Sequence, residues 1–207
     1  VNTGFVYLHR SPREGGQLDF DSQVFDFPEA LGLSESVGVD DAPILGFRDN
    51  EAFAARAGLQ VTKANPNQGH DVHTVLEDFT AWSVREGADL QYTSHYVLKD
   101  FDLVGKDPVR FSGPKFGVQF GNNTTEIAVL DARIDGFKTG VYAKNGFTFD
   151  FDPAEAGYHL IGTDLSEVGT AFDGVAPSED PRSAGAFGGV EIRLDGPLEF
   201  DGGTIAI

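Results

Sequence analysis

The segment LEDFTAWSVREGADLQY (Leu76–Tyr92) contains the pattern from which the fold of this chain can be predicted. A leading apolar residue, Leu76, is followed three residues later by a short stretch in which apolar and polar residues alternate, beginning at Phe79. Eight residues after the start of that stretch comes a glycine, followed by the order apolar, any residue, apolar. Alternation with a period of two suits a pleated strand and does not suit a helix. Each such segment therefore predicts two short strands with a corner between them.

The same pattern recurs along the chain. From Gly58 to Gly169 the glycine phrases follow one another at intervals of 23 to 30 residues, and a period of ~20–50 residues is typical of stacked repeats. Two columns with a constant offset predict which residues lie side by side in successive turns. The glycine phrases begin at Gly4, Gly58, Gly87, Gly117, Gly140, Gly169 and Gly203, and the upstream columns are Asn50, Phe79, Phe101, Ala132 and Thr163, then Ala52, Ala81, Leu103, Ile134 and Leu165.

These columns predict an all-β fold, a right-handed parallel β-helix in which equivalent strands of adjacent turns lie ~4.8 Å apart. A β-sandwich is the alternative, because many short strands with glycine-rich turns also fit that fold. We expect one domain over residues 1–207, with a long loop or irregular insertion at about 11–45 and irregular coils after about 173. The only helical signal is EAFAARAG (Glu51–Gly58), which has the composition for a turn or two of helix. The absence of an initial methionine and the strand-like ending TIAI predict a fragment of a longer solenoid.

The charge and composition of the chain exclude several classes of partner and site. The net charge is −18, from 33 acidic and 15 basic residues, and such a surface repels nucleic acids and anionic membranes. No apolar run approaches the ~20 residues that span a bilayer, so no membrane span is expected. The chain contains no cysteine, which excludes disulfides and thiolate metal sites. The sequence motifs of serine hydrolases, P-loop proteins, zinc peptidases and dinucleotide-binding proteins are absent as well.

Three stretches carry a resemblance to a known family: NTGFVYLHR (Asn2–Arg10), FRDNEAFAARAGLQV (Phe47–Val61) and FTAWSVREGADLQYTSHYVLKDFDLVG (Phe79–Gly105). The chain resembles the right-handed β-helix domains of large secreted or surface-attached proteins, of the type found in the cell-surface hyaluronidase and its bacterial homologues. The resemblance covers about residues 1–175. It implies an extracellular or cell-surface module of a larger bacterial protein that contacts a polysaccharide. No catalytic motif of that family can be matched residue by residue.

Two functions follow as hypotheses. In the first, the module binds or processes a polysaccharide, and if it is an enzyme it is a hydrolase, lyase or epimerase. In the second, it is a non-catalytic structural or adhesive scaffold, or a subunit of an extracellular multi-chain assembly. Its partners would then be the rest of the parent protein or other chains, which would meet the ends of the solenoid because strand edges are exposed there.

Asp78, Asp100 and Asp131 form the candidate catalytic column, two residues after the leading apolar position. They alternate with apolar residues and are expected to point outward. Adjacent turns would hold their carboxylates ~5 Å apart, close to the ~5–5.5 Å of retaining glycosidases. Close like charges raise one pKa, as a general acid requires. Calcium ligation and a structural corner role, in which aspartate bonds backbone amides, are the alternatives.

His73, His95 and Glu126 form a second column, three residues before the leading apolar position. Two imidazoles and a carboxylate stacked on one face could bind a sugar, share a proton or ligate a metal. Ordinary packing of loop histidines is the alternative.

The aromatic residues suggest a binding surface. Trp82 follows the inward-facing Ala81 and is therefore expected to face outward, and Tyr92 lies in the same turn. Aromatic faces beside polar groups suit sugars, so both are candidate substrate-binding residues. Packing beneath a loop is the alternative for Trp82.

Asp150 and Asp152 are the candidate metal ligands. They alternate with phenylalanines in FTFDFDPAE (Phe147–Glu155), which would place both carboxylates on one face of a strand. Oxygen ligands without cysteine suit a hard cation, so a structural Ca²⁺ is the expected cofactor. Alternation of Phe and Asp is also typical of a half-buried strand.

Overall fold

A computed structural model provides the fold and describes residues 2–9, 19–21, 36–38, 44, 46–63, 73–105, 113–143, 157–188, 190–195, 199–200 and 203–204. Over these residues the chain consists of strands and turns without a helix, so the all-β prediction is confirmed. Accordingly, none of the described segments is a helix long and apolar enough to cross a membrane.

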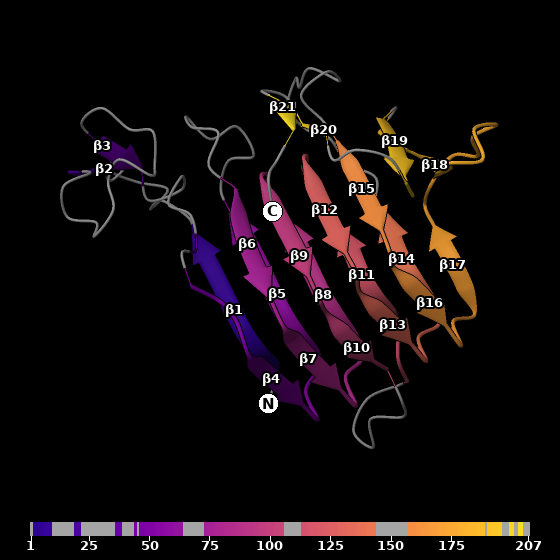
Figure 1. Cartoon of the computed structure of the whole chain (residues 1–207). Coiled ribbons are helices and arrows are strands. Elements are labelled where there is room, and N and C mark those ends of the chain that lie inside the picture. The colour runs from indigo at the N-terminus through magenta and orange to yellow at the C-terminus, as the bar shows by residue number, and fades with distance from the viewer. Residues whose placement is uncertain are drawn as a thin grey trace.

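Three sheets contain most of the described strands, and Figure 1 shows their strands stacked side by side in a regular series. Sheet I has the order β1 (Thr3–His9), β5 (Ala57–Lys63), β8 (Glu86–Gln91), β11 (Phe116–Phe120), β14 (Thr139–Ala143), β17 (Thr170–Asp173). Sheet II has the order β4 (Asn50–Phe53), β7 (Phe79–Trp82), β10 (Asp102–Val104), β13 (Arg133–Asp135), β16 (Asp164–Ser166). Sheet III has the order β6 (Thr74–Glu77), β9 (Tyr96–Lys99), β12 (Ile127–Leu130), β15 (Tyr158–Ile161), β19 (Val190–Arg193), β18 (Ser183–Phe187).

Two further pairs complete the described strands. β2 (Asp19–Asp21) pairs with β3 (Ser36–Gly38), and β20 (Glu199–Phe200) pairs with β21 (Gly203–Thr204), both in the antiparallel sense. The first pair lies in the region where a long insertion was predicted.

The chain visits sheets II, I and III in turn, so each turn contains three strands and not the two that were predicted. Within the three sheets every pair is parallel except β18 with β19. Neighbours in a sheet come from successive turns, whereas a β-sandwich is built from antiparallel strands. Three parallel sheets that share successive turns are compatible with a solenoid-like fold.

The upstream column is confirmed by the strand register. Ala52 pairs with Ala81, Ala81 with Leu103, Leu103 with Ile134, and Ile134 with Leu165. The leading apolar residues are also aligned, but on the strands of sheet III that the two-strand prediction omitted: Phe47 opposite Leu76, then Leu98, Val129 and Leu160.

Two of the glycine assignments are wrong. Thr139 pairs with Thr170 and Val141 with Phe172, so Ala171 and not Gly169 is the counterpart of Gly140. Gly203 belongs to β21 of the antiparallel pair and not to a stacked sheet. In both places the local phrase fits the repeat, but the pairing of neighbouring strands sets the register.

The stretch EAFAARAG, which has the composition for a turn or two of helix, forms strands instead. β4 ends at Phe53, the chain bends at Ala54 with a φ of 51°, and β5 begins at Ala57. A left-handed residue interrupts any right-handed helix. Burial of Ala52 against the neighbouring turn therefore overrides the helical propensity of the alanines.

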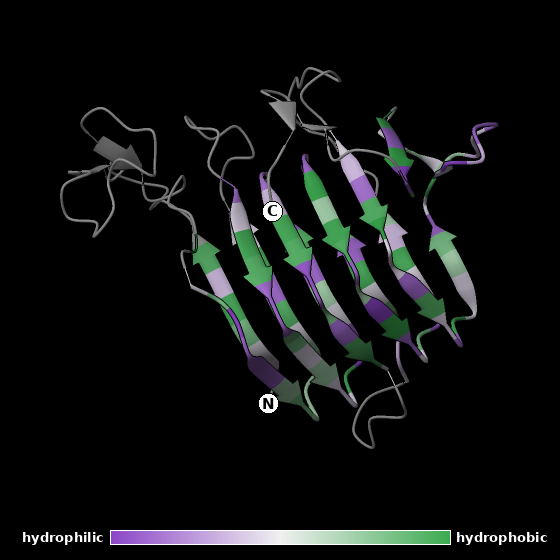
Figure 2. Cartoon of the chain, in the orientation of Figure 1, coloured by the Kyte–Doolittle hydropathy of each residue, from purple (hydrophilic) through white to green (hydrophobic). Residues whose placement is uncertain are grey.

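The interior is filled by apolar columns from all three sheets, and Figure 2 shows hydrophobic and hydrophilic residues alternating along many of the strands. The glycines of sheet I face the upstream column at close range. A Cβ added to Gly58 would lie 2.7 Å from Ala81 Cβ and 2.8 Å from Gly87 O. Because no side chain fits there, the glycine column lets the backbone of sheet I approach sheet II.

Candidate functional site

The structure brings together all three residues of the column His73, His95 and Glu126. One possible ligand atom from each residue lies within 4.8 Å of the other two. His95 Nε2 is 2.6 Å from Glu126 Oε2. The His73 and His95 rings are tilted by 46°, with their centroids 4.9 Å apart. The column predicted from the sequence is therefore a contiguous cluster of side chains.

The register of sheet III explains this convergence. Each member immediately precedes a strand of that sheet, β6, β9 or β12. The backbone ladder continues through the column, because Thr74 N–H donates to His95 O (2.8 Å) and Tyr96 N–H donates to Glu126 O (3.2 Å). One turn further on, Ile127 N–H donates to Gly157 O (2.9 Å). The column therefore ends at a glycine, which adds no side chain beyond Glu126.

Backbone conformation and burial both make this arrangement costly. His95 and Glu126 have positive φ angles of 61° and 50°, and the left-handed region costs an L-residue ~1–2 kcal/mol. The Glu126 side chain is only 2 % exposed and that of His95 15 %. A buried carboxylate costs free energy unless it is paired. The contact with His95 offsets part of that cost.

Buried hydroxyl residues immediately precede the column in two turns, and sequence reasoning missed them. Thr93 Oγ1 donates to Gln91 O (2.8 Å), and Thr124 Oγ1 donates to Gly121 O (3.1 Å). Tyr158 Oη donates to Thr124 O from inside the core, and burial raises the pKa of that phenol. The available signal was the repetition of paired hydroxyl residues, Thr93–Ser94 and Thr124–Thr125, just before the column.

Asp78, Asp100 and Asp131 lie at a different corner, between the strands of sheet III and those of sheet II. All three are exposed, as expected for outward-pointing residues, and have positive φ angles of 50°, 54° and 50°. Asp49 and Gly162, in the preceding and following turns, also have positive φ angles. Aspartate and glycine tolerate this conformation better than most residues. The backbone thus accounts for aspartate in this column, and a catalytic role stays a prediction.

The aspartate and histidine columns do not form one site. A strand of sheet III separates His73 from Asp78, which corresponds to about 16 Å along the chain. The two groups therefore lie at different corners of the same turn.

Trp82 faces outward and stacks on Phe53, which sequence reasoning missed. The ring centroids are 4.9 Å apart and the planes differ by 9°. Both side chains are exposed, Phe53 by 57 % and Trp82 by 41 %. The indole Nε1–H donates to Glu51 Oε1 over 2.6 Å. Phe53 could have been found from the register, since it lies one turn before Trp82.

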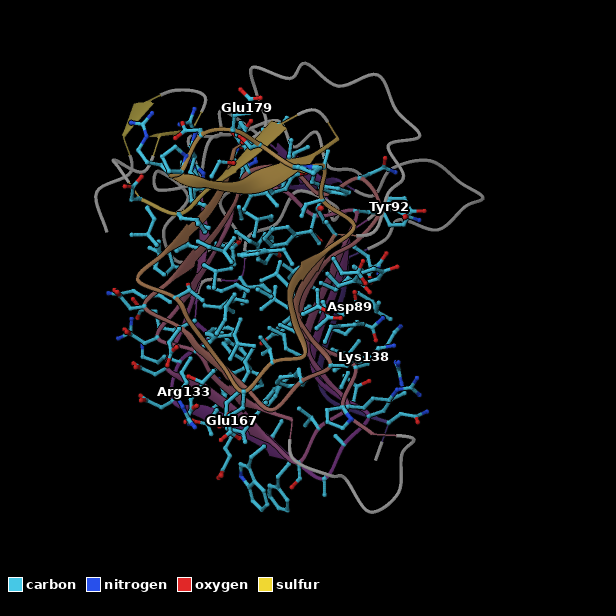
Figure 3. The ribbon with its side chains drawn as sticks, turned by 90° about the vertical axis from the view of Figure 1, so that its right-hand side faces the viewer. Asp89, Tyr92, Arg133, Lys138, Glu167 and Glu179 are labelled. Atoms are coloured by element: carbon cyan, nitrogen blue, oxygen red, sulfur yellow. The ribbon has the colours of Figure 1, made fainter. Side chains whose placement is uncertain are left out.

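The other predicted aromatic residue lies elsewhere. Tyr92 follows β8, whereas Trp82 ends β7 before the corner at Ser83, so the whole of β8 lies between them. Figure 3 shows Tyr92 on the same side of the molecule as Asp89 and Lys138. Asp89 Oδ1 accepts hydrogen bonds there from Gln119 Nε2 (2.7 Å) and Gln91 Nε2 (2.8 Å).

Beyond the aromatic pair, the outer face of sheet II is charged. Arg133 contacts Asp102 Oδ1 through Nη1 (3.0 Å) and Asp135 Oδ2 through Nη2 (2.5 Å). In the next turn Ser166 Oγ donates to Asp164 Oδ2 over 2.6 Å. Figure 3 shows Arg133 pointing away from the interior. An aromatic pair and a row of hydrogen-bonding groups therefore share this face.

The predicted calcium ligands Asp150 and Asp152 lie outside the described residues.

Comparisons of the chain with protein-family models, with curated proteins and with solved structures found no match.

Proposed function

We propose that this chain is a module of a right-handed parallel β-helix and that it binds an extracellular polysaccharide along the outer face of sheet II. The observation that carries the proposal is the exposed, stacked pair Phe53–Trp82 beside a hydrogen-bonded carboxylate. The right-handed sense is supported by the parallel sheets, because crossovers between parallel strands of one sheet are right-handed in about 98 % of cases.

The chemistry of this face suits a sugar chain. The apolar faces of pyranose rings pack on aromatic rings, and the hydroxyl groups need nearby hydrogen-bonding partners. Glu51 lies against the indole, and Arg133 lies further along the same sheet between two carboxylates. An extended polymer that ran across the strands would meet the aromatic pair first and the charged row next.

The negative charge of the chain favours an uncharged polysaccharide over an anionic one. The chain carries a net charge of −18, and on the outer face of sheet II Arg133 stands against four carboxylates, those of Glu51, Asp102, Asp135 and Asp164. Such a surface repels a polyanion. We therefore propose a polysaccharide without carboxylate or sulfate groups.

Processing of the bound polymer is a second step of the proposal. Asp78 immediately precedes strand β7 and Trp82 is its last residue, so the two residues lie about 13 Å apart along the chain. A polymer that ran along β7 from the aromatic pair, and not across the strands, would come within a few sugar units of the aspartate column. If members of the column Asp78, Asp100 and Asp131 act as acid and base, the reaction on such a polymer would be hydrolysis of a glycosidic bond within the chain, with water as the second reactant.

Affinity electrophoresis through gels that contain neutral or anionic polysaccharides tests the binding step. We expect wild-type protein to be retarded by at least one neutral polymer, and Phe53→Ala and Trp82→Ala to weaken binding about tenfold or more. Leu8→Ala is the control, because Leu8 is 63 % exposed and lies in sheet I. Each gel is run with Ca²⁺ and with a chelator, which also tests the structural calcium predicted for Asp150 and Asp152.

Retardation of Phe53→Ala and Trp82→Ala to the same extent as wild type would refute the aromatic site. No retardation of folded wild-type protein by any polymer would refute the proposed function.

One observation favours the scaffold function as a second candidate. β1 is one of the two outermost strands of sheet I, and its residues Val6 and Leu8 are 46 % and 63 % exposed. An edge strand with exposed apolar residues is a template for pairing with another chain. Under this hypothesis Leu8→Lys would abolish self-association in sedimentation experiments and leave glycan binding unchanged.

A further inference from the structure

We propose that His73, His95 and Glu126 bind one divalent transition-metal ion of the Zn²⁺ type. This proposal does not rest on the proposed function, because the column lies before the strands of sheet III and the aromatic pair lies on sheet II. It rests on the identity of the donor atoms, on their convergence and on their place in three successive turns.

The donor set selects the class of metal. Two imidazole nitrogens and one carboxylate oxygen are a set that binds Zn²⁺ with a fourth position left for water. Calcium prefers six to eight oxygen ligands, and imidazole favours zinc, copper, iron and nickel. The column therefore suits a different ion from the calcium predicted for Asp150 and Asp152.

The distances are close to those that a metal needs. Bonds of ~2.0–2.1 Å in tetrahedral geometry place ligand atoms about 3.3 Å apart. His95 Nε2 and Glu126 Oε2 are 2.6 Å apart and would separate slightly, and the widest gap in the cluster, at most 4.8 Å, would close. His73 is half-buried, and a rotation of its ring toward the ion would close that gap.

The backbone holds the three donors in place before any metal arrives. Each donor immediately precedes a paired strand, and hydrogen bonds link Thr74 to His95 and Tyr96 to Glu126. Preorganised ligands lose less conformational entropy on binding than ligands in a flexible loop. A bound ion would tie three successive turns together across their shared corner.

Such an ion binds the folded chain and not a chain whose turns are separated, so it raises the melting temperature. At a free Zn²⁺ concentration 100 times the dissociation constant, the expected rise is ~5–10 °C for a chain of this size. Any rise produced by calcium should be the same in wild type and in His95→Gln, because the nitrogen donors of this column do not suit calcium.

Isothermal titration calorimetry and melting curves with ZnCl₂ test the proposal on the full chain after treatment with a chelator. We expect one ion per chain, and at least a tenfold loss of affinity in His73→Gln, His95→Gln and Glu126→Gln. Two matched controls exchange the same groups elsewhere: Asp100→Asn removes an exposed carboxylate at another corner, and His159→Gln removes a buried histidine of β15. Both controls should bind like wild type.

Melting curves in chelator show which variants are folded, and His73→Gln keeps the test decisive if a substitution of the buried Glu126 unfolds the chain. Absorption in the visible range after addition of Co²⁺ would report tetrahedral coordination by nitrogen and oxygen. The proposal is overturned if folded wild-type protein binds no Zn²⁺ at a ratio of one to one. It is equally overturned if His73→Gln and His95→Gln bind as tightly as the two controls.

Discussion

Replacement of Gly58 by alanine is expected to destabilise the chain because of the close approach between sheets I and II. The new Cβ would lie 2.7 Å from Ala81 Cβ and 2.8 Å from Gly87 O. Neither atom is the end of a flexible side chain, so the backbones of two turns would have to separate. Gly46→Ala is the matched control, because a Cβ at that position meets nothing within 4 Å.

The expected size follows from the two contacts. An extra methyl group in a packed core costs ~1–3 kcal/mol, and for a chain of this length that corresponds to a fall in melting temperature of ~2–12 °C. Gly46→Ala should change the free energy of unfolding by less than ~1 kcal/mol, because it adds no contact and only restricts the unfolded chain.

A double-mutant cycle with Ala81→Gly isolates the contact between the two columns. Ala81→Gly removes the methyl group at 2.7 Å, so the double variant should lose less stability than the sum of the single losses. Denaturant unfolding followed by circular dichroism measures all four proteins and the Gly46→Ala control. Additive losses, or a Gly58→Ala variant as stable as Gly46→Ala, would refute the predicted approach of the two sheets.

Two further outcomes are expected. Burial raises the pKa of both Tyr96 and Tyr158 above the ordinary value of 10.0. Their contribution to stability is therefore complete below about pH 10 and is lost as the pH rises further. A spectrophotometric titration should show these two phenols ionising only as the chain unfolds, and their ionisation in the folded state would contradict this prediction. Asp100 has a φ of 54°, so Asp100→Ala should lose ~1 kcal/mol of stability while Asp100→Gly should lose little. Equal losses of the two variants in denaturant unfolding would argue against the backbone explanation for this aspartate.

The sequence predicted the stacking of turns because its signal does not depend on local propensity. Ala52, Ala81 and Leu103 occur at matching offsets, and side chains that pack on one another across turns must recur in register. The third strand of each turn was missed because the outer face of sheet III is itself largely apolar in β9 and β12. Val97 and Ala128 point away from the core and are nevertheless fully buried, so the alternation that marks a strand is absent there.

A candidate site could be predicted from the sequence only where its residues recur at one offset in successive turns. His73, His95 and Glu126 share one offset and were found as a column, and the structure brings them together. Phe53 was missed because it lies in EAFAARAG, a stretch whose alanines suggest a helix. Gly169 was misplaced because the phrase that follows it fits the repeat, whereas pairing between Thr139 and Thr170 sets the register.

The most direct test of the proposed sugar-binding face uses the fluorescence of Trp82, the single tryptophan of the chain. Its indole is 41 % exposed and stacks on Phe53, so a sugar bound at this pair must change its emission. We expect a saturable change in intensity or wavelength on titration with an oligosaccharide of the neutral polymer that retards the protein, and loss of that change in Phe53→Ala. Binding of the oligosaccharide with unchanged emission from Trp82 would contradict the account and place the glycan on another face.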